Sequence, residues 1–163
     1  MARIESKLAA LGLVLPAPLK APPGVPLPFA MVRIVGTRAI VSGHGPQNAD
    51  GSLAQPLGKV GADLTIEQGY AAARLTGLCV LSTLRRYLGS LDPVTRVVRV
   101  QGFVNCAPGF NTPSDVLHGF SDLMVEVFGD NGRHTRAAIG AAELYADIPC
   151  EIEATFEVAA LDA

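Results

Sequence analysis

Tryptophan is absent from this chain of 163 residues, aromatic residues make up only 6%, and charged residues only 17%. Hydrophobic residues reach 49% and the mean hydropathy is +0.33, so little charge is available to cover the surface. The length fits one domain, and we expect part of the apolar surface to be buried in an oligomer. The net charge of -2 and the scattered Lys and Arg residues disfavour nucleic acid as a partner.

Long apolar runs and paired cysteines are also missing. No stretch approaches the roughly 20 apolar residues of a membrane-spanning helix. Cys79, Cys106 and Cys150 are far apart and have no CxxC spacing, which favours free buried thiols in a reducing cytosol. The three histidines share no ligand spacing, and no phosphate-binding loop occurs. The sequence therefore predicts a cytoplasmic protein without a membrane partner or a metal site.

The first 28 residues differ in character from the rest. Ile4, Leu8 and Leu11 have the spacing of a short docked helix. Residues 16–28 hold six of the twelve prolines, so they can form neither a helix nor a central strand, and we expect an extended arm. We predict that residues 1–28 form this helix and arm, and that residues 29–163 form the domain.

The rest of the chain alternates between strand and helix patterns. Thr65 begins a capping box, and Thr112 offers an N-cap before a proline at the first helical position. The predicted order is strand, strand, helix, strand, helix, strand, strand, at residues 31–35, 39–42, 65–88, 94–105, 112–128 and two segments that open near Arg136 and Glu151. This order predicts an α+β fold with both long helices on one face of a single sheet.

Arg136 and Glu151 carry the most informative chemistry. They are fifteen residues apart and each opens a strand pattern, so we expect the intervening loop to bring both side chains to one end of a β-ribbon. A guanidinium matches a carboxylate, and a neighbouring carboxylate can hold a water or accept a proton. The pair could thus bind a small acid and hydrolyse it. The alternative is an exposed arginine and a solvated acidic strand face, and His134 before them is interpreted as an exposed loop residue.

With these segments identified, the chain resembles the YjgF/Rid family, also called the endoribonuclease L-PSP family, over about residues 29–158. The matching positions are Val41-Ser42-Gly43-x-x-Pro46, the helix at 65–88, Gly102-Phe103-Val104-Asn105, and Arg136 followed by Glu151-Ile152-Glu153-Ala154. The resemblance implies a chorismate-mutase-like fold in a homotrimer, with sites between subunits.

The resemblance also implies roles for individual residues. Arg136 would bind the carboxylate of an imino or enamino acid, and Glu151 would position the attacking water. The implied reaction is deamination to a keto acid and ammonia, with no cofactor and no metal. The positions expected to contact the substrate are Phe29, Ser42, Gly43, His44, Asn105 and Ala138.

Several residues depart from the family pattern and indicate a divergent branch with a proline-rich N-terminal extension. Ala138 stands where many relatives have cysteine or serine, Phe29 replaces a common tyrosine, and His44 replaces glutamine. These departures leave a second function open, namely a metabolite-binding or regulatory module without turnover. The excess of acidic over basic residues disfavours an endoribonuclease. A chorismate mutase is disfavoured because its dianionic substrate requires several converging cations, and Arg136 is the single well-placed one.

Overall fold

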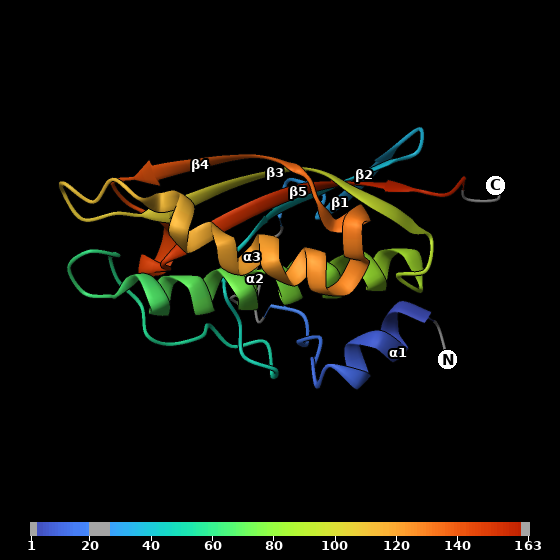
Figure 1. The fold of residues 1–163 in the computed structure, drawn as a ribbon, viewed down its shortest axis with the longest axis horizontal. Helices are drawn as coiled ribbons and strands as arrows, with labels where there is room; N and C mark the ends of the chain where they lie inside the picture. Colours follow the sequence, from blue (N-terminus) through green and yellow to red (C-terminus); the bar gives the residue numbers. More distant parts are fainter. Residues whose placement is uncertain (1–2, 20–26, 161–163) are drawn as a thin grey trace.

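One mixed five-stranded sheet organises the fold, and its long helices pack on one face (Figure 1). The computed structural model describes residues 3–19 and 27–160. The strands are β1 (Val32–Val35), β2 (Arg38–His44), β3 (Val94–Asn105), β4 (Thr135–Ala141) and β5 (Cys150–Val158). The helices are α1 (Arg3–Ala10), α2 (Ile66–Leu88) and α3 (Pro113–Phe128), with short 3-10 turns η1 (Gly129–Gly132) and η2 (Tyr145–Asp147). The predicted α+β class is confirmed.

The strand order in the sheet is β1-β2-β5-β3-β4, so β1 and β4 are its edges. Neighbouring strands are antiparallel except for β3 and β4, which are parallel. The predicted β-ribbon between the strands of Arg136 and Glu151 is therefore wrong, because β3 lies between β4 and β5. The physical reason is that α3 forms a crossover that returns β4 parallel to β3, and the segment after β4 must then pass the end of β3 to begin β5.

Local signals set the ends of the two long helices. Thr65 and Gln68 form the predicted capping box at the start of α2, and Gly89 ends the helix with φ 80°. Helix α3 begins at Pro113 with Thr112 at the N-cap position, as expected, but the Thr112 side chain does not cap the helix. Its ψ of 48° is not the extended conformation of an N-cap, and its side chain makes no capping hydrogen bond.

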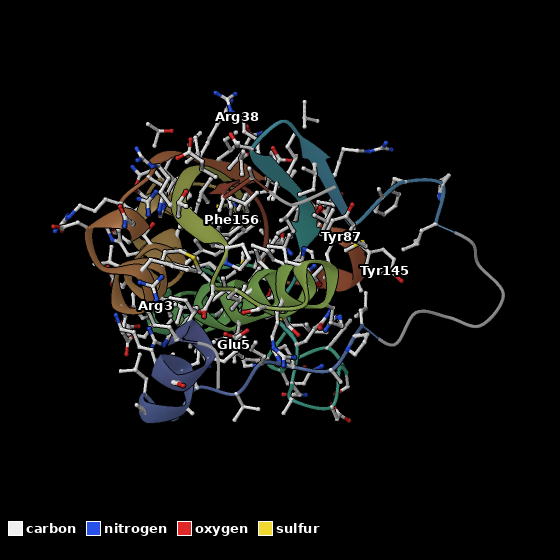
Figure 2. All side chains as sticks on the ribbon, turned by 90° about the vertical axis from the view of Figure 1, so that its right-hand side faces the viewer. Arg3, Glu5, Arg38, Tyr87, Tyr145 and Phe156 are labelled. Carbon is white, nitrogen blue, oxygen red and sulfur yellow. The ribbon has the colours of Figure 1, made fainter. Side chains whose placement is uncertain are left out.

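The core lies between the sheet and the helices, and β5 shows how the sequence places it. Ile152, Ala154, Phe156 and Val158 are buried, while the residues between them are exposed or half-buried. This alternation confirms the predicted strand with one apolar and one acidic face. Phe156 is fully buried in the middle of the molecule (Figure 2). A side chain of this kind stabilises the fold by about 1.5–3 kcal/mol through burial.

Helix α1 is docked against this core. Ile4 and Leu8 belong to the buried cluster, which confirms the docked helix. The carboxylate of Asp92 accepts hydrogen bonds from the backbone N–H groups of Arg3 and Ile4, both at 2.8 Å, and so caps the helix start.

The segment after α1 is tied to the body of the protein. The Ser82 hydroxyl donates to the carbonyl of Pro16 at 2.6 Å, and Ala17 N–H donates to the carbonyl of Ala49. Residues 20–26 of the predicted arm lie outside the described residues, and the boundary after residue 28 stays a prediction. In the described part of the chain the three cysteines are free, and no helix is long and apolar enough to cross a membrane.

Candidate functional site

Ser42, Gly43 and Glu151 form one part of the candidate site, which we name the β2–β5 half-site. The pairing of β2 with β5 shifts between Val41 and His44, so the backbone at Ser42 and Gly43 departs from regular strand geometry. A Cβ added at Gly43 would overlap the Glu151 carboxylate, so glycine allows this side chain its place. The Ser42 hydroxyl donates to the carbonyl of Ala30 at 2.7 Å and anchors the segment. The bulged backbone of β2 at Ser42 and Gly43 and the Glu151 carboxylate thus lie together.

Arg136 forms the second part with two serines of α3, Ser114 and Ser121, which we name the β4–α3 half-site. Arg136 pairs in register with Val100, a buried residue under the helices, so its side chain points to the helix side of the sheet. Its Nη1 donates to Ser121 Oγ at 2.9 Å, and its Nη2 donates to Ser114 Oγ at 2.7 Å. The guanidinium is therefore held in a fixed orientation by α3.

The electrostatics of Arg136 favour an anion. Desolvation lowers the pKa of Arg136, and the nearby charge of Asp122 raises it. The guanidinium is still charged at neutral pH, because the ordinary pKa of an arginine lies far above neutrality. Within residues 3–19 and 27–160, no carboxylate forms an ion pair with Arg136. A partly desolvated cation that bonds only neutral oxygens can attract a carboxylate.

The two half-sites do not meet within one chain. Glu151 pairs with Phe103 and points to the sheet face that the helices leave open, whereas Arg136 points to the helix face. Two strand spacings and three residues along β3 separate their backbones by about 14 Å. The expectation that one loop brings both side chains together is wrong for a single chain, because β3 lies between them.

The other predicted contact residues are dispersed. Phe29 is 55% exposed, and Ala138 lies on the same strand face as Arg136 and is half-buried. Asn105 is fully buried: its amide oxygen accepts from Lys59 Nζ at 3.1 Å, and its amide nitrogen donates to Asp147 at 2.9 Å. Both ends of the Asn105 amide are thus engaged inside the chain, and its predicted contact with substrate stays a prediction.

His44 points to the helix side, away from Glu151. Its Nδ1 lies 2.6 Å from the carbonyl of Ser42, and its Nε2 lies 2.9 Å from Thr83 Oγ1. Since a carbonyl only accepts, Nδ1 donates to Ser42, and Nε2 of the neutral ring accepts from the Thr83 hydroxyl. His44 therefore connects α2 to the backbone of the β2–β5 half-site. Its predicted contact with substrate stays a prediction.

Buried His44 makes stability depend on pH. Burial lowers the pKa of His44, the hydrogen bond to Ser42 raises it, and the charge of Arg86 lowers it further. The unfolded chain therefore binds a proton at His44 more readily than the folded chain does. As a result, the contribution of His44 to the free energy of unfolding is fully present above about pH 6.5 and is lost as the pH falls below this value. Burial also lowers the pKa of His134, which adds in the same direction. We expect the free energy of unfolding to fall between pH 7 and pH 5, by up to about 1.4 kcal/mol per pH unit for each histidine.

Urea denaturation across this pH range checks the expectation. A His44→Gln variant should show a shallower pH dependence, and His118→Gln, on the exposed side of α3, is the control. A His44→Gln variant with the pH dependence of the wild type would contradict the assignment of the effect to His44.

Sequence reasoning missed the residues that orient Arg136. Ser114 and Ser121 are seven residues apart, so they lie on one face of α3, and this spacing was the available signal. The interpretation of His134 as an exposed loop residue is wrong. It is half-buried, with Nε2 3.0 Å from Ser121 Oγ and its ring edge-on to Phe120. The turn before β4 folds back onto α3, and composition alone does not show this.

Comparisons with known proteins agree with this architecture. A family model described as "YjgF/chorismate mutase-like, putative endoribonuclease" matches residues 5–150. Protein TCP17 of Trypanosoma cruzi is 40% identical over 157 residues, which cover 96% of this chain and 94% of that protein. The crystal structure of Atu1372 from Agrobacterium tumefaciens, a protein of unknown function, is 33% identical with a TM-score of 0.83, covering 95% of this chain and 91% of that one. A structure from Shewanella oneidensis described as a "putative endoribonuclease" is 32% identical with a TM-score of 0.85, covering 95% and 99%.

Proposed function

The chain belongs to the YjgF/chorismate mutase-like family, and from this premise we propose that it hydrolyses small imino or enamino acids to keto acids and ammonia. The observation that carries the proposal is the environment of the Arg136 guanidinium, which can accept an anionic ligand. Its guanidinium is partly desolvated, bonds Ser114 and Ser121, and has no carboxylate partner among the described residues. A planar acid group is the ligand that best fits this fork.

Arg136 alone is too weak to hold a substrate. A charge-assisted hydrogen bond contributes about 1.5–3 kcal/mol, whereas even millimolar binding requires about 4 kcal/mol. Backbone groups and an apolar wall must supply the rest. The β2–β5 half-site offers such a backbone at Ser42 and Gly43, next to a carboxylate that can hold water.

Because the two half-sites lie on opposite faces of one sheet, we propose that each complete site is built from two copies of the chain. One copy would supply Arg136 from the edge strand β4, and its neighbour would supply Ser42, Gly43 and Glu151. A closed ring gives every copy the same contacts, and the proposed assembly is a homotrimer. The sheet face free of helices is available for the contacts between copies (Figure 1).

The proposed reaction needs one carboxylate and one water. Arg136 would hold the substrate carboxylate while Glu151 accepts a proton from water and the water oxygen attacks the imine carbon. The C=N electron pair moves to nitrogen, which takes this proton from Glu151, and a tetrahedral carbinolamine results. Glu151 then takes the hydroxyl proton of the carbinolamine and passes it to the nitrogen, the C–N bond breaks, ammonia leaves, and the C=O of the keto acid forms. An enamino acid first takes a proton at carbon to become the imine.

The test is the rate of pyruvate formation from freshly generated 2-iminopropionate. The spontaneous reaction already proceeds, so lowering its barrier by about 1.4 kcal/mol gives a tenfold acceleration. We expect folded wild-type protein to accelerate pyruvate release in proportion to its concentration. No acceleration with 2-iminopropionate or a bulkier imino acid would contradict the proposal.

Ala138 favours a second candidate, a metabolite-binding module without turnover. It lies two residues after Arg136 on the same strand face and offers a methyl group instead of a reactive or hydrogen-bonding side chain. For such a module, pyruvate should raise the melting temperature in a concentration-dependent way while imine hydrolysis keeps its spontaneous rate. The two measurements together distinguish the enzyme from the binding module.

A further inference from the structure

A cavity separate from Arg136 lies on the helix side of the sheet, between β1, β2 and the C-terminal part of α2. Its volume is about 590 Å³, within the roughly 300–1,000 Å³ common for small-molecule sites. Leu19, Leu27, Met31 and Val32 give it apolar walls. Tyr87, another lining residue, lies between the end of α2 and the β1–β2 hairpin (Figure 2).

Arg86 is the one full charge among the described residues that line this cavity. Its Nη1 donates to Ser82 Oγ at 2.7 Å and to the carbonyl of Pro16 at 3.4 Å, and its Nη2 donates to Thr83 Oγ1 at 2.9 Å. A guanidinium has five N–H groups, so these three bonds leave two N–H groups to bind a ligand. No carboxylate of the described chain pairs with Arg86.

The remaining polar groups around Arg86 supply no negative charge. Thr83 accepts from Arg86 and donates to His44, and His44 donates to the carbonyl of Ser42. Each group is thereby paired inside the protein, and the relay fixes the guanidinium beside the apolar wall. An uncompensated cation next to an apolar wall selects a ligand with one negative charge and an apolar body.

We propose that this cavity binds a small monocarboxylate of about six carbons. Its carboxylate lies on Arg86, and its tail lies against Leu27, Met31 and Val32. Gly43 lines this cavity and also belongs to the β2–β5 half-site, but the two sites use different faces of the sheet: Arg86 lies on the helix side, whereas Glu151 lies on the open side. A free acid in the cell could occupy it without taking part in imine hydrolysis.

Titration calorimetry of the full chain with hexanoate, hexanol and hexylammonium tests the proposal. We expect hexanoate to bind most tightly, hexylammonium not to bind, and butyrate to bind about 15-fold more weakly than hexanoate because it lacks two buried methylenes. Arg86→Gln should weaken hexanoate binding at least about tenfold and leave hexanol binding unchanged. The matched control is Arg85→Gln, because Arg85 is the next residue of the same helix but pairs with Glu5 of α1 at 3.4 Å.

Two further variants separate this site from a general effect on folding or on Arg136. Leu27 is 53% exposed, so Leu27→Asp should fold and weaken hexanoate binding through like charge. Arg136→Ala should bind hexanoate as the wild type does. The proposal is overturned if hexanoate does not bind, if hexylammonium binds equally well, or if Arg85→Gln or Arg136→Ala reduces hexanoate binding as much as Arg86→Gln.

Discussion

Replacing Arg136 by alanine is expected to lower kcat/KM for 2-iminopropionate about 100-fold, which corresponds to the loss of a charge-assisted pair of roughly 3 kcal/mol. The physical reason is that Arg136 is a partly desolvated cation fixed by Ser114 and Ser121, with no carboxylate partner among the described residues. Arg136→Lys should recover little activity, because an ammonium group lacks the planar fork that matches a carboxylate. Initial rates of pyruvate release measure both variants.

Arg133→Ala is the matched control for this prediction. Arg133 is three residues away, and its side chain is 74% exposed and pairs with Asp130 on the surface. We expect it to keep the wild-type rate. The free energy of unfolding of Arg136→Ala should differ from the wild type by less than about 1 kcal/mol, since the freed serine hydroxyls can bond water. Equal losses of activity in both variants would contradict a specific role for Arg136.

Replacing Gly119 by alanine is expected to lower the free energy of unfolding by about 3 kcal/mol, through overpacking between α2 and α3. A Cβ at Gly119 would overlap the backbone carbonyl oxygen of Tyr70 in α2. Backbone atoms cannot move aside as a flexible side chain can, so α3 must shift away from α2. Thermal unfolding should show a melting temperature lower by about 10 °C.

Gly69→Ala provides the same substitution where the neighbours can adjust. A Cβ at Gly69 would lie 3.1 Å from side-chain atoms of Val116 and Val60. The gain in helix propensity, about 1 kcal/mol, offsets this crowding, and we expect a net change below about 1 kcal/mol. A Gly119→Ala variant as stable as Gly69→Ala would show that α2 and α3 do not pack as described.

Much of the fold is predictable from the sequence, because hydrophobic alternation and helix caps mark strands and helix ends that the structure also has. The alternation in β5 identifies the face that packs under the helices, and the capping box at Thr65 and the glycine at Gly89 fix the ends of α2. Each signal depends on residues a few positions apart, within the reach of one strand or one helical turn. The class of fold follows from the order of such segments.

The arrangement of the site is not predictable in this way. The separation of Arg136 and Glu151 depends on β3 inserting between β4 and β5, which is a property of the whole sheet. The partners of Arg136 come from α3, fifteen and twenty-two residues earlier in the chain. Spacing in the sequence shows which residues can carry the chemistry, but not the sheet face that each one reaches.

A site shared between two copies of the chain is tested most directly by mixing two inactive variants, Arg136→Ala and Glu151→Gln. If each site takes Arg136 from one copy and Glu151 from its neighbour, random mixing restores both residues at about a quarter of the sites. The measurement is the rate of pyruvate release from 2-iminopropionate by co-expressed variants, compared with each variant alone. We expect about a quarter of the wild-type rate for the mixture and almost none for either variant alone. A mixture no more active than its separate components would contradict a site shared between copies of the chain.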